Sequence, residues 1–177
     1  MRIVILALAI AALASPAAAA PARPAPFVVA SQADMFGYYM PVTPVRTGAF
    51  KLIDLALGAP EDFRRFAGGE RFGGTWAPVL LEFAPAAAQE QEGDAGPYWS
   101  GSFRILPTTF AISDRTVSFS GFDKRLGAVR FEGTLDMAAL AAERDQSNSG
   151  TGRIVLTGTL TVKGRAYPVS FLWFGGD

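Results

Sequence analysis

The stretch R-I-V-L-T-G-T-L-T-V-K-G-R-A-Y-P-V-S-F-L-W, residues 153–173, carries the clearest structural signal in the chain. Apolar side chains alternate with threonine through residues 154–162, and large apolar side chains occupy every second position from Tyr167 to Trp173. This period-two alternation is typical of half-buried antiparallel strands. Lys163-Gly164 lies between the two halves and suits a tight turn. The stretch therefore predicts a β-hairpin.

The same alternation extends toward the amino terminus. Arg115–Phe122 and Ala128–Leu135 predict two more antiparallel strands, joined by a short hairpin loop at Asp123–Gly127. Less regular apolar runs predict further strands, and prolines interrupt two of them, Pro78 favouring an edge position or a late start and Pro107 separating two strands. These runs are Gly37–Val42, Phe50–Gly58, Trp76–Phe83, Tyr98–Leu106 and Thr109–Ser113.

Two short helices are predicted between the strands. Pro60 suits the start of the first, which should place Phe63 and Phe66 against one end of the core. Asp136 can cap the second helix, Met137–Arg144. We therefore expect an all-β protein, an antiparallel β-barrel or sandwich of about seven to nine strands with two short helices.

Two strand segments resemble each other, F-E-G-T-L at residues 131–135 and L-T-G-T-L at residues 156–160. Glycine inside a strand often marks a sharp bend, as at the corner of a barrel. The repeated glycine favours a barrel over a flat sandwich, although coincidence between two short strings explains it equally well.

The composition excludes several kinds of site. The 177 residues include no histidine and no cysteine, so there are no imidazole bases, thiol nucleophiles, disulfides or thiolate metal sites. Sixteen basic and sixteen acidic side chains balance, whereas nucleic-acid binding needs a basic surface. We find no catalytic motif, and we expect no cofactor, no metal and no nucleic-acid partner.

Residues 1–19 have the features of a secretory signal peptide. Arg2 precedes an apolar run, and small residues surround the expected cleavage after Ala19. The run has about 12 residues, short of the roughly 20 that span a bilayer, so we expect no membrane span after signal removal. Residues 20–26 form a Pro/Ala-rich spacer, and residues 27–177 are expected to form a single antiparallel β domain, periplasmic or secreted.

Aromatic side chains are the leading candidates for a ligand site. Small barrels either fill their interior with such side chains or leave a cavity that they line. A lined cavity would suit an apolar molecule. The candidate lining residues are Phe50, Trp76, Trp99, Phe103, Phe119, Phe131, Phe171 and Trp173.

Carboxylates are the other candidates. Asp54 and Glu82 each lie inside an apolar strand, and burial would raise the pKa of either group enough for acid catalysis. The more ordinary interpretation is an outward position or a pairing with Arg104 or Arg130. The acidic loop with Glu90, Glu92 and Asp94 offers oxygen ligands for calcium but lacks a following bidentate acid, so a solvated loop is the better interpretation.

Residues 158–171, G-T-L-T-V-K-G-R-A-Y-P-V-S-F, resemble a segment of the YceI-like family. That family comprises exported bacterial proteins with a lipocalin-like antiparallel barrel that binds polyisoprenoid-type lipids. The resemblance covers these 14 residues, and the family's histidine-bearing stretches are missing here. It implies a barrel fold and a lipid-like ligand.

These features predict an exported, non-enzymatic binding protein that holds a small apolar or lipid-like molecule in an aromatic-lined β-barrel. The alternative is a protein-interaction or envelope-accessory module with a filled core. Such a module would use outward-facing apolar side chains of the last strands, namely Val155, Leu172 and Phe174. A carboxylate-dependent hydrolase is a remote third alternative.

Overall fold

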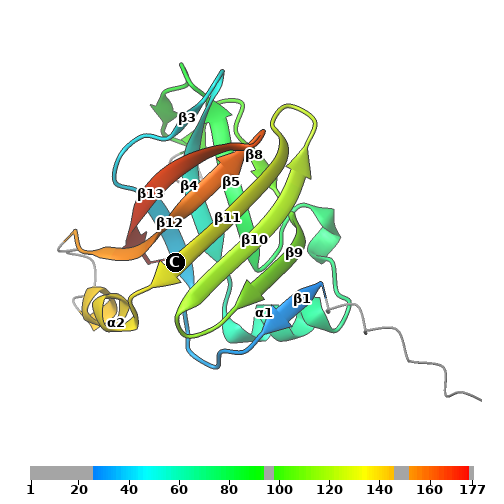
Figure 1. Ribbon diagram of the computed structural model, residues 1–177, viewed down its shortest axis with the longest axis vertical. Coiled ribbons are helices and arrows are strands. Elements are labelled where there is room, and N and C mark those ends of the chain that lie inside the picture. The colour runs from blue at the N-terminus through cyan, green and yellow to red at the C-terminus, as the bar shows by residue number, and fades with distance from the viewer. Residues whose placement is uncertain (1–25, 94–97, 146–151, 176–177) are drawn as a thin grey trace, which may run out of the picture.

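A computed structural model describes residues 26–93, 98–145 and 152–175, and in these residues ten strands form one curled sheet (Figure 1). A short strand, β3, pairs only with β4, and β6 and β7 form a separate ribbon. Both helices lie at the lower end of the sheet in Figure 1. The elements are β1 (Phe27–Val29), β2 (Gly37–Pro41), β3 (Arg46–Thr47), β4 (Phe50–Leu57), α1 (Pro60–Ala67), a 3₁₀ turn (Phe72–Gly74), β5 (Val79–Pro85), β6 (Glu90–Gln91), β7 (Tyr98–Trp99), β8 (Phe103–Ile105), β9 (Pro107–Ile112), β10 (Thr116–Asp123), β11 (Gly127–Leu135), α2 (Met137–Asp145), β12 (Ile154–Val162) and β13 (Arg165–Phe174).

The strand order is β1-β9-β10-β11-β12-β13-β2-β4-β5-β8. Strands β9 to β13 are neighbours in both sequence and space, because each is joined to the next by a turn or, for β11 and β12, by α2. The predicted hairpins at residues 115–135 and 153–173 are confirmed, and Lys163 and Gly164 both have positive φ in the turn. The prediction of a β-rich, barrel-like fold is therefore confirmed, in the form of a half-barrel.

Two details of the fold prediction agree only roughly with the structure. The sheet has more strands than the expected seven to nine, and it is mixed because β1 pairs with β9 in parallel. Three-residue strands such as β1 and β8 are too short for an alternation pattern to reveal. Strand β5 begins late, at Val79, as predicted. Pro107 is the first residue of β9, and Leu106 is the residue that separates β8 from β9.

A single bent segment contributes the last strand of the sheet order, β8, and the second strand, β9. Residues 103–105 pair with β5, and residues 107–112 pair with β10, so only Leu106 separates the two partners. At this bend a Cβ atom on Gly121 of β10 would lie 2.7 Å from the Leu106 carbonyl oxygen. The close approach of β10 to the bend requires glycine at position 121.

The interior of the curled sheet is filled by large side chains. Phe63 and Phe66 on α1 and Leu140 on α2 cover its lower end, as predicted for Phe63 and Phe66. Side chains from most of the strands meet between the two halves of the sheet, and the largest fully buried ones include Tyr39, Phe83, Phe119, Phe131, Phe171, Leu55, Leu81 and Ile105. The core thus runs the length of the sheet.

Paired glycines make room for one of these rings. Gly133 on β11 and Gly158 on β12 are cross-strand partners, so the two similar sequence segments lie side by side. A Cβ atom on Gly158 would lie 2.8 Å from the Phe131 ring, and a Cβ atom on Gly133 would meet the same ring. The Phe131 ring therefore occupies the space above both glycines, and the sheet can curl tightly around it.

The signal peptide, the spacer up to residue 25 and Asp94 lie outside the described residues. Neither helix in the described ranges has the length and apolarity that crossing a bilayer requires.

Candidate functional site

The eight aromatic candidates separate into several groups. Phe119, Phe131 and Phe171 belong to the buried core, where the Phe131 and Phe171 rings meet edge to face with centroids 5.6 Å apart. Phe50 and Phe103 meet each other in the same way at 5.2 Å. These contacts fill space between strands, and the proposed role of the rings in lining a ligand cavity stays a prediction.

The three tryptophans are half-buried, and Trp173 packs against the buried core. Lys51 Nζ lies 3.7 Å from the centroid of the Trp99 ring and donates a hydrogen bond to the Ala88 carbonyl oxygen at 2.7 Å. Trp76 packs edge-on against Phe72 near α1. Trp173 Nε1 donates to the Phe36 carbonyl oxygen at 3.0 Å. These contacts are therefore with a lysine and with loop residues.

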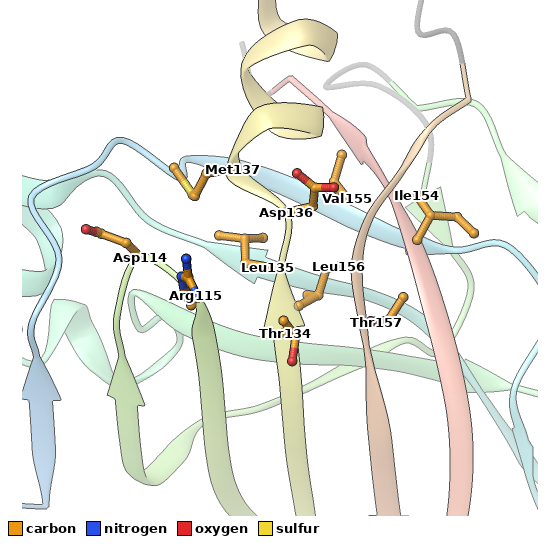
Figure 2. A pocket seen from close by; sticks show the side chains of 10 residues that line it. All are labelled: Asp114, Arg115, Thr134, Leu135, Asp136, Met137, Ile154, Val155, Leu156 and Thr157. Atoms are coloured by element: carbon orange, nitrogen blue, oxygen red, sulfur yellow. The ribbon is translucent and has the colours of Figure 1, made fainter.

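A groove of about 670 Å³ opens where β11 ends, α2 begins and β12 starts (Figure 2). Its position follows from the chain path, since α2 is inserted between two paired strands. Leu135 and Leu156 are cross-strand partners at its base, and Asp136 N donates to the Val155 carbonyl oxygen at 2.8 Å. The residues lining the groove are Asp114, Arg115, Thr134, Leu135, Asp136, Met137, Ile154, Val155, Leu156 and Thr157.

Most of the charged groups at the groove have structural partners. Asp136 Oδ1 accepts a hydrogen bond from Ala139 N at 2.9 Å and so caps α2. Asp114 Oδ1 accepts a hydrogen bond from Ser31 Oγ. Within the described ranges, the Arg115 guanidinium at the groove has no ion pair. The groove therefore presents apolar walls and one available cation.

Apolar side chains also gather on the outer face of the sheet beside this groove. Leu172 on β13 is paired with Ile154 on β12 and with Met40 on β2, and Phe174 is paired with Tyr38. The exposed fractions are 46% for Ile154, 46% for Tyr38 and 47% for Phe174. We call this surface the outer apolar patch; its members are Tyr38, Met40, Val42, Ile154, Leu172 and Phe174.

A second depression, of about 350 Å³, connects the patch to the groove. Val42 and Ile154 both line it, and Ile154 and Thr157 belong to the groove as well. Thr134, Thr157 and Ser170 form a cross-strand row of hydroxyl groups next to the apolar side chains. The patch and the groove thus form one continuous surface with a polar border.

The sequence identified this surface only in part. Phe174 is exposed, as expected, whereas Leu172 is half-buried and Val155 is fully buried and not outward-facing. The register shifts between Ile154 and Leu156, so that Val155 turns inward and Ile154 faces solvent in its place. Tyr38 and Met40 were missed because their contribution depends on β2 pairing with β13, which no local pattern indicates.

The two candidate carboxylates lie directly opposite each other. Asp54 on β4 is paired with Glu82 on β5, and Glu82 is paired with Arg104 on β8, whose Nε donates to Glu82 Oε2 at 3.2 Å. Asp54 is 9% exposed, and no described residue hydrogen-bonds to its Oδ1. Burial, followed by the nearby Glu82 charge, raises the pKa of Asp54 to about 7. Of the two groups, Glu82 has the ordinary arginine pairing and Asp54 does not.

The acidic loop and Arg130 are the remaining candidates from the sequence. Glu90 lies on β6 and Glu92 follows it, and both are exposed. In residues 26–93, 98–145 and 152–175, no three acidic side chains converge to hold a metal ion. Arg130, the other suggested carboxylate partner, is exposed on β11 opposite Thr161.

Comparisons with known proteins do not assign this site. No protein-family model, no curated protein and no solved structure matches the chain. The resemblance of residues 158–171 to the YceI-like family therefore stays a prediction, and the functional argument depends on the geometry of the surface itself.

Proposed function

We propose that the protein is an exported, non-enzymatic binding module that docks an apolar surface of another envelope protein on its outer apolar patch. The observation that carries the proposal is the cross-strand block formed by Ile154, Leu172 and Met40 together with Phe174 and Tyr38. Soluble monomers rarely expose contiguous apolar patches, and such patches are typical of interaction sites.

The composition of the patch specifies the partner's chemistry. None of its six members is charged, so a charged partner surface would lose its hydration here without gaining an ion pair. The hydroxyl row of Thr134, Thr157 and Ser170 can hydrogen-bond at the border, as the polar rim of an interface does. The partner is accordingly an uncharged apolar surface with hydrogen-bonding groups at its edge.

The packing of the interior supports this proposal over a ligand held within the barrel. Phe119, Phe131 and Phe171 are at most 2% exposed and belong to the core cluster. The Phe119 ring packs against Gly121, and the Phe131 ring packs against Gly133 and Gly158. An aromatic core packed in this way stabilises an exported domain that has no disulfides.

A photo-crosslinking amino acid placed at position 174 tests the proposal in the cell envelope. We expect a specific crosslinked adduct with a partner protein, and we expect Leu172→Asp to reduce it at least tenfold, because loss of a central apolar contact typically costs about 2 kcal/mol. Phe122 provides the matched control, since it is 66% exposed but lies on β10 near the opposite hairpin turn. Equal adducts from positions 122 and 174, or an adduct at 174 that Leu172→Asp leaves unchanged, would contradict the proposal.

A small apolar ligand in the groove is the second candidate function. The observation that favours it is the volume of about 670 Å³, which falls within the range of small-molecule sites. Met137 and Ile154 would contact the apolar body of the ligand, and the Arg115 guanidinium would form an ion pair with a carboxylate at its end. Native mass spectrometry of the purified protein tests this: a bound mass that Met137→Asp removes would support it, and a protein that carries no ligand after incubation with oleate would contradict it.

A further inference from the structure

Strand β1 is attached to the fold differently from its neighbours. It pairs only with β9, and this is the parallel pair in a sheet whose other described pairs are antiparallel. Three register pairs hold it, centred on Val28 opposite Ala111. It is also the end of the strand order, so its other edge has no partner among the described strands. A short edge strand of this kind pairs with the sheet in the way that an extended peptide ligand adds a strand to an exposed sheet edge.

The site that holds β1 has specific features. Phe110 N donates to the Pro26 carbonyl oxygen at 3.0 Å, and Ala30 N donates to the Ile112 carbonyl oxygen at 2.8 Å, so backbone hydrogen bonds flank the strand. The Phe27 ring meets Phe66 of α1 edge to face at 4.9 Å and lies 5.1 Å from Phe110.

The Arg71 guanidinium lies 5.4 Å from the Phe27 centroid and 4.4 Å from the Phe66 centroid. We call Phe66, Phe110 and Arg71, which surround the Phe27 ring, the clamp. Arg71 also donates to the Phe66 carbonyl oxygen at 2.9 Å, which keeps the guanidinium in place. The edge of β9, α1 and Arg71 therefore form an acceptor for a strand with an aromatic first residue.

The connection from β1 to β2 can serve as a hinge. Ser31 and Met35 are buried, and the chain bends between them at Ala33, where no side chain of residues 32–34 is buried. Asp34 is held to α2, because Arg144 donates hydrogen bonds to its carbonyl oxygen and to its carboxylate. Ser31 Oγ accepts a hydrogen bond from Ala33 N within this bend. Straightening residues 32–34 would release the Asp34–Arg144 ion pair and the Ser31–Asp114 hydrogen bond, and it would carry β1 away from β9.

We propose that this acceptor also takes Phe27–Val29 of a second copy of the chain, so that two copies can exchange their β1 strands and form a symmetric dimer. The segment already seated in the site has the sequence that the second copy supplies, so every contact of the clamp is reproduced in the exchanged form. Only the hinge differs between the two forms, and exchange of identical elements is a low-cost route to a two-fold dimer. Protein concentration and hinge length therefore set the equilibrium between the monomer and the strand-exchanged dimer.

The absence of cysteine from the chain makes a direct test possible. Val28 is exposed and faces the same side as its partner Ala111, so a Val28→Cys chain and an Ala111→Cys chain are unfolded together, refolded at high concentration and treated with a short bismaleimide. We expect a two-chain adduct whose yield rises with protein concentration. A Val28→Cys chain refolded with a Phe122→Cys chain is the matched control and should give no more than background.

Two variants refine the test. Phe27→Ala on the Val28→Cys chain removes the aromatic anchor and should reduce the two-chain adduct several-fold. Deleting Gln32 and Ala33 shortens the hinge, which prevents closure within one chain and should shift the protein to a dimer in light scattering. If the double variant Val28→Cys/Ala111→Cys crosslinks within one chain while the mixed single variants never crosslink between chains, the proposal is overturned.

Discussion

Asp54→Asn should remove a pH-dependent cost from the folded protein. The Asp54 carboxyl is nine-tenths buried beside Glu82, and these surroundings raise its pKa from 3.8 to about 7. In the unfolded chain the group ionises near its ordinary value. A difference of about three pKa units, at about 1.4 kcal/mol per unit, gives a cost of at most about 4 kcal/mol once the pH exceeds 7.

The sign follows from proton linkage. Between pH 4 and pH 7 the unfolded chain has released the Asp54 proton while the folded protein retains it, so the contribution of Asp54 to stability falls as the pH rises. Asparagine has nearly the same shape and cannot ionise. The free energy of unfolding of Asp54→Asn minus that of the native sequence should therefore be near its minimum at pH 4 and increase by up to about 4 kcal/mol by pH 8.

Urea unfolding followed by tryptophan fluorescence at several pH values between 4 and 9 measures this difference. Glu82→Gln is the companion variant, because removing the neighbouring charge should lower the Asp54 pKa, so that the loss of stability ends at a lower pH and is smaller. A difference between Asp54→Asn and the native sequence that stays constant from pH 4 to pH 8 would refute the reasoning. It would mean that the Asp54 pKa is not raised by its surroundings.

Other substitutions test the packing and the surface charges. Gly158→Ala forces a Cβ atom against the Phe131 ring and the Glu132 backbone, so denaturant unfolding should show a loss of about 2 kcal/mol or more. Phe131→Ala should cost about 3–5 kcal/mol in the same assay, because a fully buried ring leaves a cavity. Asp123→Asn should show the opposite pH trend to Asp54→Asn. The hydrogen bonds from Arg125 lower the Asp123 pKa to about 2, so its contribution, about 1 kcal/mol after screening, is present above pH 4 and is lost as the pH falls toward 2.

The parts of the fold that the sequence predicts well are those held by local hydrogen bonds. Strands β10 to β13 follow one another in the chain, and each buries large apolar side chains at alternating positions, so alternation alone locates them. The parallel pairing of β1 with β9 joins residues some eighty positions apart, and a three-residue strand carries no periodic signal. The pairing of β2 with β13 is similarly remote, and it is this pairing that assembles the outer apolar patch.

The candidate site shows the same division. Asp54 and Glu82 were recognisable individually because each interrupts an apolar run, but their direct opposition depends on the register of β4 and β5, including a shift between Leu52 and Asp54. Val155 was misplaced for a related reason: a bulge moves one residue to the other face, and a strict period-two pattern has no means of indicating where a bulge occurs.

The bend at Leu106 affects how the protein unfolds. Strands β9 to β13 form a local meander, and β2, β4, β5 and β8 form the other half of the sheet. Hydrogen bonds between β13 and β2 join the halves on one side, and the covalent backbone through Leu106 joins them on the other. If the two halves of the sheet separate, the segment with β8 and β9 must lose its pairing with either β5 or β10. We therefore expect amide protons of β5 and β10, the two strands that flank this segment, to exchange together through global unfolding and not through opening of one half.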